Sequence, residues 1–279
     1  MSASRGGNMS AARVQLVAWH VFKEGARDRV LFTMVGFSVI VFGASLLLGQ
    51  LTAGQDMKII KDLGLSVIEV AGVLMSVLIG VGLVAREIDK RSIYGLLARP
   101  LRRWEFILGK YLGLVMTLAG NVAVMTLALY LVLGWMQWTA TPVVRASWEA
   151  PAMDPAMLVA VTLLMAELAV LTAVALFFST FSSSALWSTL FSLGVFVAGQ
   201  FSGELRDLAS ALGSRSAGLV GTAVSVVLPS FAAFDVKSQV VHGLPIPLEF
   251  VGLTLAYAAL YAAAILTATS VLFNRRDFQ

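Results

Sequence analysis

Long runs of apolar residues, separated by short polar stretches, dominate the chain. Several uncharged runs exceed the ~18 residues that a helix needs to cross a bilayer. Short segments of alternating hydrophobicity, which would indicate a membrane barrel, are not seen. The pattern therefore predicts an all-α integral membrane protein with six transmembrane helices. These spans are expected at about residues 30–48, 63–85, 111–134, 156–178, 185–201 and 248–273.

The amino-terminal part differs from the rest of the chain. Residues 1–12 are small and polar, and we expect them to form a disordered tail. From Arg13 to Arg29 apolar and charged residues mix, which suits an amphipathic elbow helix at the inner membrane surface. Residues 13–279 are then expected to form a single transmembrane domain.

The segment 216–234 leaves two topologies open. It is uncharged and long enough to cross, but it is rich in glycine and serine and contains Pro229. If it crossed, the chain would have seven spans and Arg275 and Arg276 would lie outside. We expect instead a re-entrant or surface helical element on the outer face, with its backbone covered by protein.

The distribution of charge favours six spans. With six, the inner side collects 14 Lys and Arg against 6 Asp and Glu, whereas the outer side and the membrane interior together collect 6 and 10. Cytoplasmic loops carry the excess of Lys and Arg, so both termini are expected in the cytoplasm. The composition agrees with a membrane protein, since only 13% of residues are charged and the mean hydropathy is +0.86.

The most highly charged segment lies between the second and third spans. Between Arg86 and Lys110 there are seven Lys and Arg and three Asp and Glu. A helix continuing from the second span would place Glu87 one turn before Arg91, which is a favourable pair, and Pro100 would end it. Its apolar residues form no single stripe, which suits a protein groove better than lipid. From these residues alone, a docking segment and an ordinary basic loop are equally open.

The run from Glu87 to Gly113 resembles the cytoplasmic coupling segment of ABC type-2 exporter permeases. Their pattern is a glutamate after the second span, a short helix ending in Leu-Leu-x-x-Pro, an arginine-rich turn, and Gly-Lys leading into the third span. Three further stretches resemble the family's elbow, the start of its second span and the segment before its last span: Phe22–Val30, Lys61–Leu65 and Leu228–Gly243. The likeness covers nearly the whole chain. It is nearest to the branch containing the permease of the nitrous-oxide-reductase maturation exporter.

The resemblance implies the transmembrane permease subunit of an ATP-driven exporter in a bacterial inner membrane. The implied partners are two ABC ATPase subunits, a second permease copy in a homodimer, the lipid bilayer and an accessory protein in the periplasm. In such permeases the coupling helix seats in the ATPase, and the residues after it brace it at the inner interface. The coupling residues would be Glu87, Ile88, Asp89, Arg91, Ser92, Tyr94, Leu96 and Leu97, and the bracing residues Pro100, Arg103, Trp104 and Lys110.

Catalytic and metal-binding residues are not expected in this chain. The string nearest to a phosphate-binding loop, at Leu108–Tyr111, lacks the leading glycine and the hydroxyl residue of that motif. ATP and magnesium are therefore expected on a separate ATPase chain, and no cofactor on this one. There is no cysteine, and His20 and His242 are expected on opposite sides of the membrane, so no metal site is expected. Topology already explains the basic loop, so no nucleic-acid partner is expected.

Two glutamates lie inside the predicted spans. Glu167 is about halfway along the fourth span, and Glu69 is roughly two turns from the outer end of the second. A charge at mid-bilayer costs on the order of 3 kcal/mol, so such residues face a cavity or a partner. For Glu167 we favour a role in the substrate path, and for Glu69 a carboxyl group that pins helices together.

Two rival functions stay open at the level of sequence. One is a secondary carrier that uses Glu167 and Glu69 to relay protons and needs no ATPase. The other is a membrane scaffold that transports nothing and recruits a cytosolic protein through its basic loop.

Overall fold

The computed structural model describes residues 3–25, 27, 29–51, 56–89, 103–148, 150–182, 184–204 and 228–275. The regular secondary structure of these residues is helical throughout, as the sequence predicts. The helices are α1 (Ala3–Gly25), α2 (Arg29–Leu51), α3 (Asp56–Asp89), α5 (Arg103–Thr139), α6 (Pro142–Ala146), α7 (Ala156–Phe181), α8 (Ala185–Gln200), the 3-10 helix η1 (Phe231–Phe234), α11 (Lys237–Val241) and α12 (Leu248–Arg275).

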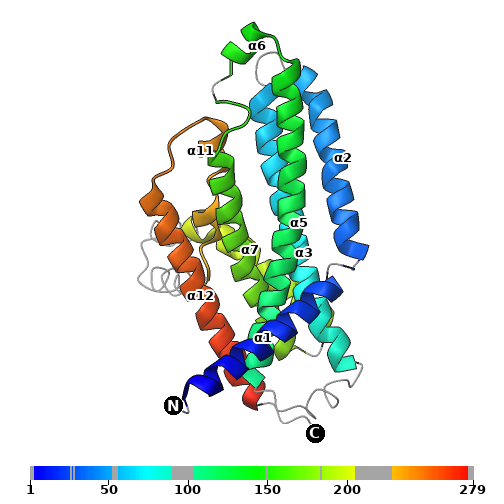
Figure 1. Cartoon of the computed structure of the whole chain (residues 1–279), viewed down its shortest axis with the longest axis vertical. Coiled ribbons are helices and arrows are strands. Elements are labelled where there is room, and N and C mark those ends of the chain that lie inside the picture. The colour runs from blue at the N-terminus through cyan, green and yellow to red at the C-terminus, as the bar shows by residue number, and fades with distance from the viewer. Residues whose placement is uncertain are drawn as a thin grey trace.

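The long helices form an elongated bundle (Figure 1). α7 packs against α3, α5 and α12, and α2 packs against α3. α1 crosses the lower end of the bundle at an angle, close to the start of α5, and α6 lies at the upper end (Figure 1). The last turns of α12 also lie toward the lower end (Figure 1).

Four helices of the described chain are long and apolar enough to cross a membrane: Met57–Gly82, Trp104–Thr139, Ala156–Thr180 and Leu248–Phe273. Together they define a multi-pass membrane protein. The first predicted span falls on α2, whose side chains the structure describes from Phe32 to Ala44, and the fifth falls on the shorter apolar helix α8, Ala185–Gln200. The total of six crossings therefore stays a prediction.

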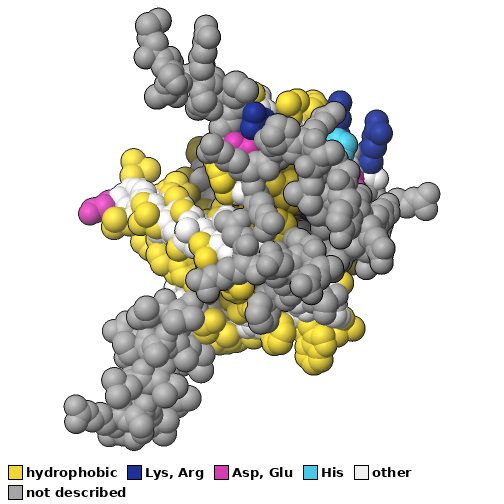
Figure 2. Space-filling model, turned by 90° about the horizontal axis from the view of Figure 1, so that it is seen from below, with side chains coloured by type: hydrophobic (Ala, Val, Ile, Leu, Met, Phe, Trp, Pro, Cys, Tyr) yellow, Lys and Arg dark blue, Asp and Glu magenta, His cyan; other side chains and the backbone are white. Residues whose placement is uncertain are grey.

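The surface of the bundle suits a membrane. Large apolar side chains are exposed along its helices, among them Phe37 on α2, Leu131 on α5 and Leu260 on α12. Seen from the lower end, hydrophobic side chains cover much of the described surface, while several Lys, Arg and His side chains lie near one edge of the view (Figure 2). Apolar side chains on the outside of a helical bundle are expected where lipid surrounds it.

Several helices extend beyond their predicted bounds. α3 begins at Asp56 rather than near Leu63, and α5 begins at Arg103 rather than near Tyr111. The polar residues in these extensions form helix as readily as apolar ones, so hydropathy marks only the apolar part of each helix. α1 likewise begins at Ala3, inside the segment 1–12 that was predicted to be disordered, since no proline or run of like charges interrupts a helix there.

Small residues bring α1 against α5. A Cβ atom added to Gly113 would lie 2.6 Å from the carbonyl oxygen of Ala18, and one added to Gly109 would lie 2.7 Å from the Cβ atom of Val17. Gly109 and Gly113 are one turn apart on one face of α5, the spacing that lets helix backbones approach closely in membranes. This face holds the predicted elbow helix across the lower end.

The contact of α3 with α7 positions the interior of the bundle. A Cβ atom at Gly80 would lie 2.9 Å from that of Ala175, so the two helices are in close contact there. Apolar side chains such as Ile68 and Leu168 are fully buried along this contact. Glu69 and Glu167 therefore lie beside the core that α3 and α7 share.

Candidate functional site

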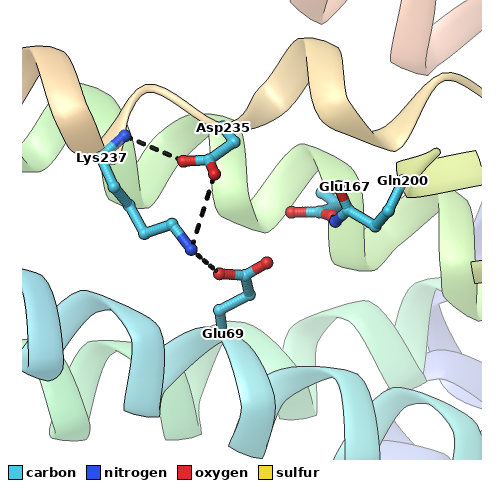
Figure 3. A network of polar contacts seen from close by, with 5 residues as sticks. All are labelled: Glu69, Glu167, Gln200, Asp235 and Lys237. Carbon is cyan, nitrogen blue, oxygen red and sulfur yellow. Dashed lines mark hydrogen bonds and ion pairs between the residues drawn. The ribbon is translucent and has the colours of Figure 1, made fainter. Parts of the chain in front are cut away.

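A group of charged and polar side chains from several elements of the bundle lies close together (Figure 3). They come from α3, α7, the end of α8, and the turn between η1 and α11. We call this group the central polar cluster, and its members are Glu69, Glu167, Gln200, Asp235 and Lys237.

Both glutamates lie deep in their helices. Glu167 is about 17 Å along α7 from Ala156, given the rise of 1.5 Å per residue. Glu69 is about 20 Å along α3 from its first residue, Asp56. Its position roughly two turns from the outer end of the second span stays a prediction, because the bounds of α3 do not say where the bilayer begins. The two glutamates share a similar depth.

An ion pair joins α3 to the start of α11. The Nζ atom of Lys237 donates a hydrogen bond to the Glu69 carboxylate and lies 3.6 Å from Oδ2 of Asp235. The backbone N–H of Lys237 also donates to Oδ1 of Asp235 at 3.0 Å. The side chains of Lys237 and Glu69 are only 21% and 14% exposed, so water screens their attraction weakly.

The surroundings of Lys237 keep its side chain charged. Burial alone would lower the pKa of Lys237, but the hydrogen bond and charge of Glu69, with the charges of Asp235 and Glu167, outweigh burial and raise it. The ammonium group is therefore present at neutral pH and is lost only under strongly alkaline conditions.

A second polar contact joins α7 to α8. The side-chain amide of Gln200 donates a hydrogen bond of 2.9 Å to Oε1 of Glu167. Glu167 is 2% exposed, and Gln200 stands at the carboxyl end of α8. In Figure 3 the Glu167 carboxyl group lies beside Gln200 and apart from the contacts of Lys237. Glu167 thus has a side-chain amide from α8 as its hydrogen-bond partner.

A small cavity adjoins the central polar cluster. Its wall combines carboxyl groups with aliphatic and aromatic side chains, so it is polar on one side and apolar on the other. It is lined by Leu65, Glu69, Ala160, Leu164, Glu167, Phe234, Asp235, Val236 and Lys237. The prediction that Glu167 and Glu69 each face a cavity or a partner holds for both residues, since each has a partner and each lines this cavity.

The chain before α12 inserts among the helices around this cavity. We call Leu228–Val241 the inserted segment. Ser230 donates its backbone N–H to the hydroxyl oxygen of Tyr257 on α12 at 3.0 Å. A Cβ atom on Gly199 of α8 would lie 2.4 Å from the carbonyl oxygen of Pro229, so the two backbones are in direct contact. The described part of the predicted outer element at 216–234 is thus covered by protein; 216–227 lie outside the described residues.

Two phenylalanines anchor the inserted segment. The ring of Phe231 lies 5.3 Å from that of Phe196 on α8, and the ring of Phe234 lies 6.2 Å from that of Tyr257 on α12. Both phenylalanines are buried. Contacts from α3, α7, α8 and α12 therefore meet at this segment.

The predicted coupling residues lie at the other end of the bundle, where the structure describes only part of them. α3 continues as a helix through Glu87, Ile88 and Asp89, and α5 begins at Arg103. Trp104 is exposed, whereas Lys110 is buried with its Nζ atom 4.7 Å from the ring centroid of Phe106. Outside the described residues are Arg91, Ser92, Tyr94, Leu96, Leu97 and Pro100.

Reasoning from the sequence missed Lys237, Asp235 and Gln200 as partners of the two glutamates. Lys237 and Glu69 are 168 positions apart, and no periodicity connects them. One signal was available, because an acid inside an apolar span needs a compensating group, and Lys237 stands just after the uncharged segment 216–234.

The central polar cluster contains acids, an amide and one amine. The described residues include no group of three or more His, Cys, Asp or Glu side chains placed to hold a metal ion. What the cluster can do is tie helices together, present carboxylates to a cavity and compensate their charge. A helical bundle of membrane length with charged groups beside an interior cavity defines a polytopic membrane protein of the transport class.

Comparison with known families agrees with this class. The family described as ABC-2 family transporter protein matches residues 15–278, and the chain belongs to this family. The resemblance to ABC type-2 permeases is thereby confirmed, and the chain is a permease component that works with an ABC ATPase subunit. No curated protein sequence matches the chain.

Proposed function

We propose that the chain is the permease of an ATP-driven exporter and couples to two separate ATPase subunits through the connection between α3 and α5. The observation that carries this proposal is the family match over residues 15–278. The course of α3 supports it, because this helix continues without a break to Asp89 and so includes Glu87 and Ile88, the first of the proposed coupling residues.

In this mechanism Glu87 to Leu97 form the coupling helix that seats in the ATPase. Pro100, Arg103, Trp104 and Lys110 hold it against the inner end of the bundle. Closure of the ATPase dimer moves the coupling helix and opens a path between two identical permease copies. Glu167 and Glu69 line that path. ATP and magnesium stay on the ATPase, and this chain contributes no catalytic group.

The proposed topology has six crossings, with α2 and α8 as the first and fifth. Both termini are cytoplasmic and the membrane is a bacterial inner membrane. α1 and the end of α12 both lie toward the lower end of the bundle, which supports this topology (Figure 1). The proposal extends to the branch of the nitrous-oxide-reductase maturation exporter, with an accessory protein in the periplasm.

Two substitutions in the coupling helix test the proposal. Glu87→Arg reverses a charge and Leu96→Asp removes an apolar anchor, so each is expected to abolish co-purification of the tagged ATPase with the permease. Val143→Asp, on exposed α6 at the opposite end, is the control and should leave co-purification unchanged. If both coupling variants retain the ATPase, Glu87 to Leu97 is not the docking surface.

A proton-coupled carrier is the second candidate, and the placement of Glu69 and Glu167 beside an interior cavity favours it. Vesicles loaded with fluorescent lipid, peptide and dye probes distinguish the two mechanisms. Export that requires ATP and persists when the proton gradient is collapsed supports the exporter. Export that needs no ATP and stops when the gradient is collapsed supports the carrier.

The role of Glu167 needs a test of its own. Glu167→Gln should slow export or change its pH dependence. If this variant exports like the unaltered chain, Glu167 does not line the path. Membership of a transporter family argues against the third hypothesis, a membrane scaffold that transports nothing.

A further inference from the structure

The cavity beside the central polar cluster has more acidic than basic groups in its wall. Of the described residues that line it, Glu69, Glu167 and Asp235 carry carboxyl groups, and Lys237 alone carries an ammonium group. That ammonium group contacts Glu69 and Asp235. Within the described part of the chain, Glu167 has the hydrogen bond from Gln200 and no ion pair. The cavity wall is therefore short of positive charge at Glu167.

The carboxyl group of Glu167 forms the buried end of the cavity. One of its oxygen atoms accepts the amide of Gln200, and the other is directed to the side of the cluster where Glu69 and Asp235 lie (Figure 3). Glu167 is 2% exposed, whereas the side chain of Asp235 is 44% exposed. The wall thus leads from an accessible carboxylate to a buried one, and a carboxylate buried without a cation is costly.

The rest of the cavity wall is apolar. It includes Leu65 of α3, Leu164 of α7, and Phe234 and Val236 of the inserted segment. These side chains offer contacts to an aliphatic or aromatic group, and the face of an aromatic ring attracts a cation. Carboxyl groups beside apolar surface match a ligand that carries a positive charge on an apolar body.

The spacing of the acids suits an ammonium group better than a bare metal ion. No three His, Cys, Asp or Glu side chains among the described residues are placed to hold a metal. A primary ammonium group has three N–H donors, which can reach carboxylates that are too far apart to share a metal ion. An anion would be repelled by the same carboxylates, and a neutral ligand would leave Glu167 without a positive partner.

We propose that this cavity is a binding site for the exported substrate, and that the substrate is an organic cation with an ammonium group and an apolar body. The inference rests on the proposed function, since it names the class of substrate for the exporter. The ammonium group binds between Glu167 and Glu69, and the apolar body contacts Leu65, Leu164 and Phe234. Lys237 is the chain's own ammonium group at this site, so it competes with the substrate for Glu69.

Binding of three small molecules tests the preference for charge. The probes are radiolabelled phenethylammonium, 2-phenylethanol and phenylacetate, which share a phenyl ring and differ in charge. The full chain is purified with its ATPase in phosphatidylcholine nanodiscs without nucleotide, and empty nanodiscs correct for partition into lipid. Equilibrium dialysis should show phenethylammonium bound at least about tenfold more tightly than either other probe. Methylammonium, which lacks the apolar body, should displace it only at much higher concentration.

Substitutions in the cluster should change this affinity in opposite directions. Glu167→Gln removes an acid and should weaken phenethylammonium binding about tenfold, whereas Lys237→Gln removes the competing cation and should strengthen it about tenfold. The double variant Lys237→Gln with Glu69→Gln keeps the net charge of the cluster, so its affinity should return toward that of the unaltered chain. Glu249→Gln, at an exposed position of α12, is the control and should bind like the unaltered chain.

Two results would overturn the cation site. One is phenethylammonium binding that is no tighter than that of 2-phenylethanol. The other is a loss of binding in Lys237→Gln as large as in Glu167→Gln, in complexes that keep their ATPase, because the cluster would then be a structural tie. Either result leaves the proposed function intact. If the ATPase does not co-purify with the unaltered chain, the proposed function fails, and dialysis of the permease alone decides whether the cation site belongs to a carrier.

Discussion

At the scale of residues, buried charges in this bundle connect elements that are distant in sequence. Lys61 is fully buried on α3 and donates a hydrogen bond of 2.7 Å to the carbonyl oxygen of Pro151, in the connection between α6 and α7. Glu105 is buried on α5, and its Oε2 atom lies 3.8 Å from the guanidinium group of Arg13 on α1. A buried charge without such a partner would destabilise the fold, so these contacts fix how the helices meet.

The hydrogen bond between Gln200 and Glu167 is expected to stabilise the bundle. Gln200→Ala removes the donor and leaves a buried carboxyl oxygen without its partner, which costs about 1–3 kcal/mol in the free energy of unfolding. Chemical unfolding of the purified permease in detergent measures this loss. Gln15→Ala, at an exposed position of α1, is the matched control. Equal stability of the two variants would show that the contact contributes nothing.

The sequence predicted part of the central polar cluster at this scale. Glu69 and Glu167 stood out because each is the only charge within its apolar span. Their partners did not, because Lys237 and Gln200 are brought to them by the packing of α11 and α8, which local patterns do not encode. The inward position of Lys237 depends on the whole bundle being assembled.

At the scale of elements, the elbow helix is held by shape as well as charge. The glycine face of α5 receives α1 so closely that the carbonyl oxygen of Ala18 occupies the place of a side chain on Gly113. The elbow helix was predicted from its mixed composition. The glycine-containing face of α5 on which it packs was not predicted, although the spacing of Gly109 and Gly113 is visible in the sequence.

Adding a side chain to the face of α5 formed by Gly109 and Gly113 should separate α1 from α5. Gly113→Ala puts a methyl group against a backbone carbonyl, and overpacking of this kind costs about 1–3 kcal/mol of stability. Gly120→Ala is the control, because a Cβ atom there meets nothing within 4 Å, and alanine favours a helix. Thermal unfolding in detergent should show a lower midpoint for Gly113→Ala alone. Matching midpoints would mean that α1 does not pack here in the membrane.

The ends of helices were harder to predict than their centres. Hydropathy locates the apolar part of α3 but does not show that the helix begins as early as Asp56. The continuation past Arg86 was expected from the sequence, and α3 runs to Asp89. Polar residues at the start of a helix leave no signal in hydropathy, so the boundary predicted near Leu63 lies inside α3.

At the scale of the whole molecule, the alternation of helix direction determines which surfaces face which compartment. α1 marks the lower end of the bundle and α6 the upper end (Figure 1). The excess of basic residues predicts that the lower end faces the cytoplasm. The helical fold class and the approximate positions of the long helices in the described parts of the chain followed from the sequence, because the bilayer imposes helical structure and minimum length.

Single cysteines should report this orientation. His20 on α1 and Ser147 after α6 are both exposed, and the chain has no cysteine of its own. In intact cells, a maleimide that cannot cross the membrane should label Ser147→Cys, and it should label His20→Cys only after the cells are permeabilised. The opposite pattern would invert the topology, and labelling of both in intact cells would place the two ends on one side.

α5 has a mechanical consequence of its own. It runs unbroken for 37 residues, or about 55 Å, from the lower end of the bundle to the connection with α6. A bilayer core is only about 30 Å thick, so a single stiff rod extends beyond it. Tilting such a rod by about 5° about one end displaces the other by about 5 Å, given the rise per residue. A small displacement of α5 at Arg103 can therefore move its opposite end, on the far side of the membrane, by tilting the whole helix. This transmission requires no series of side-chain rearrangements.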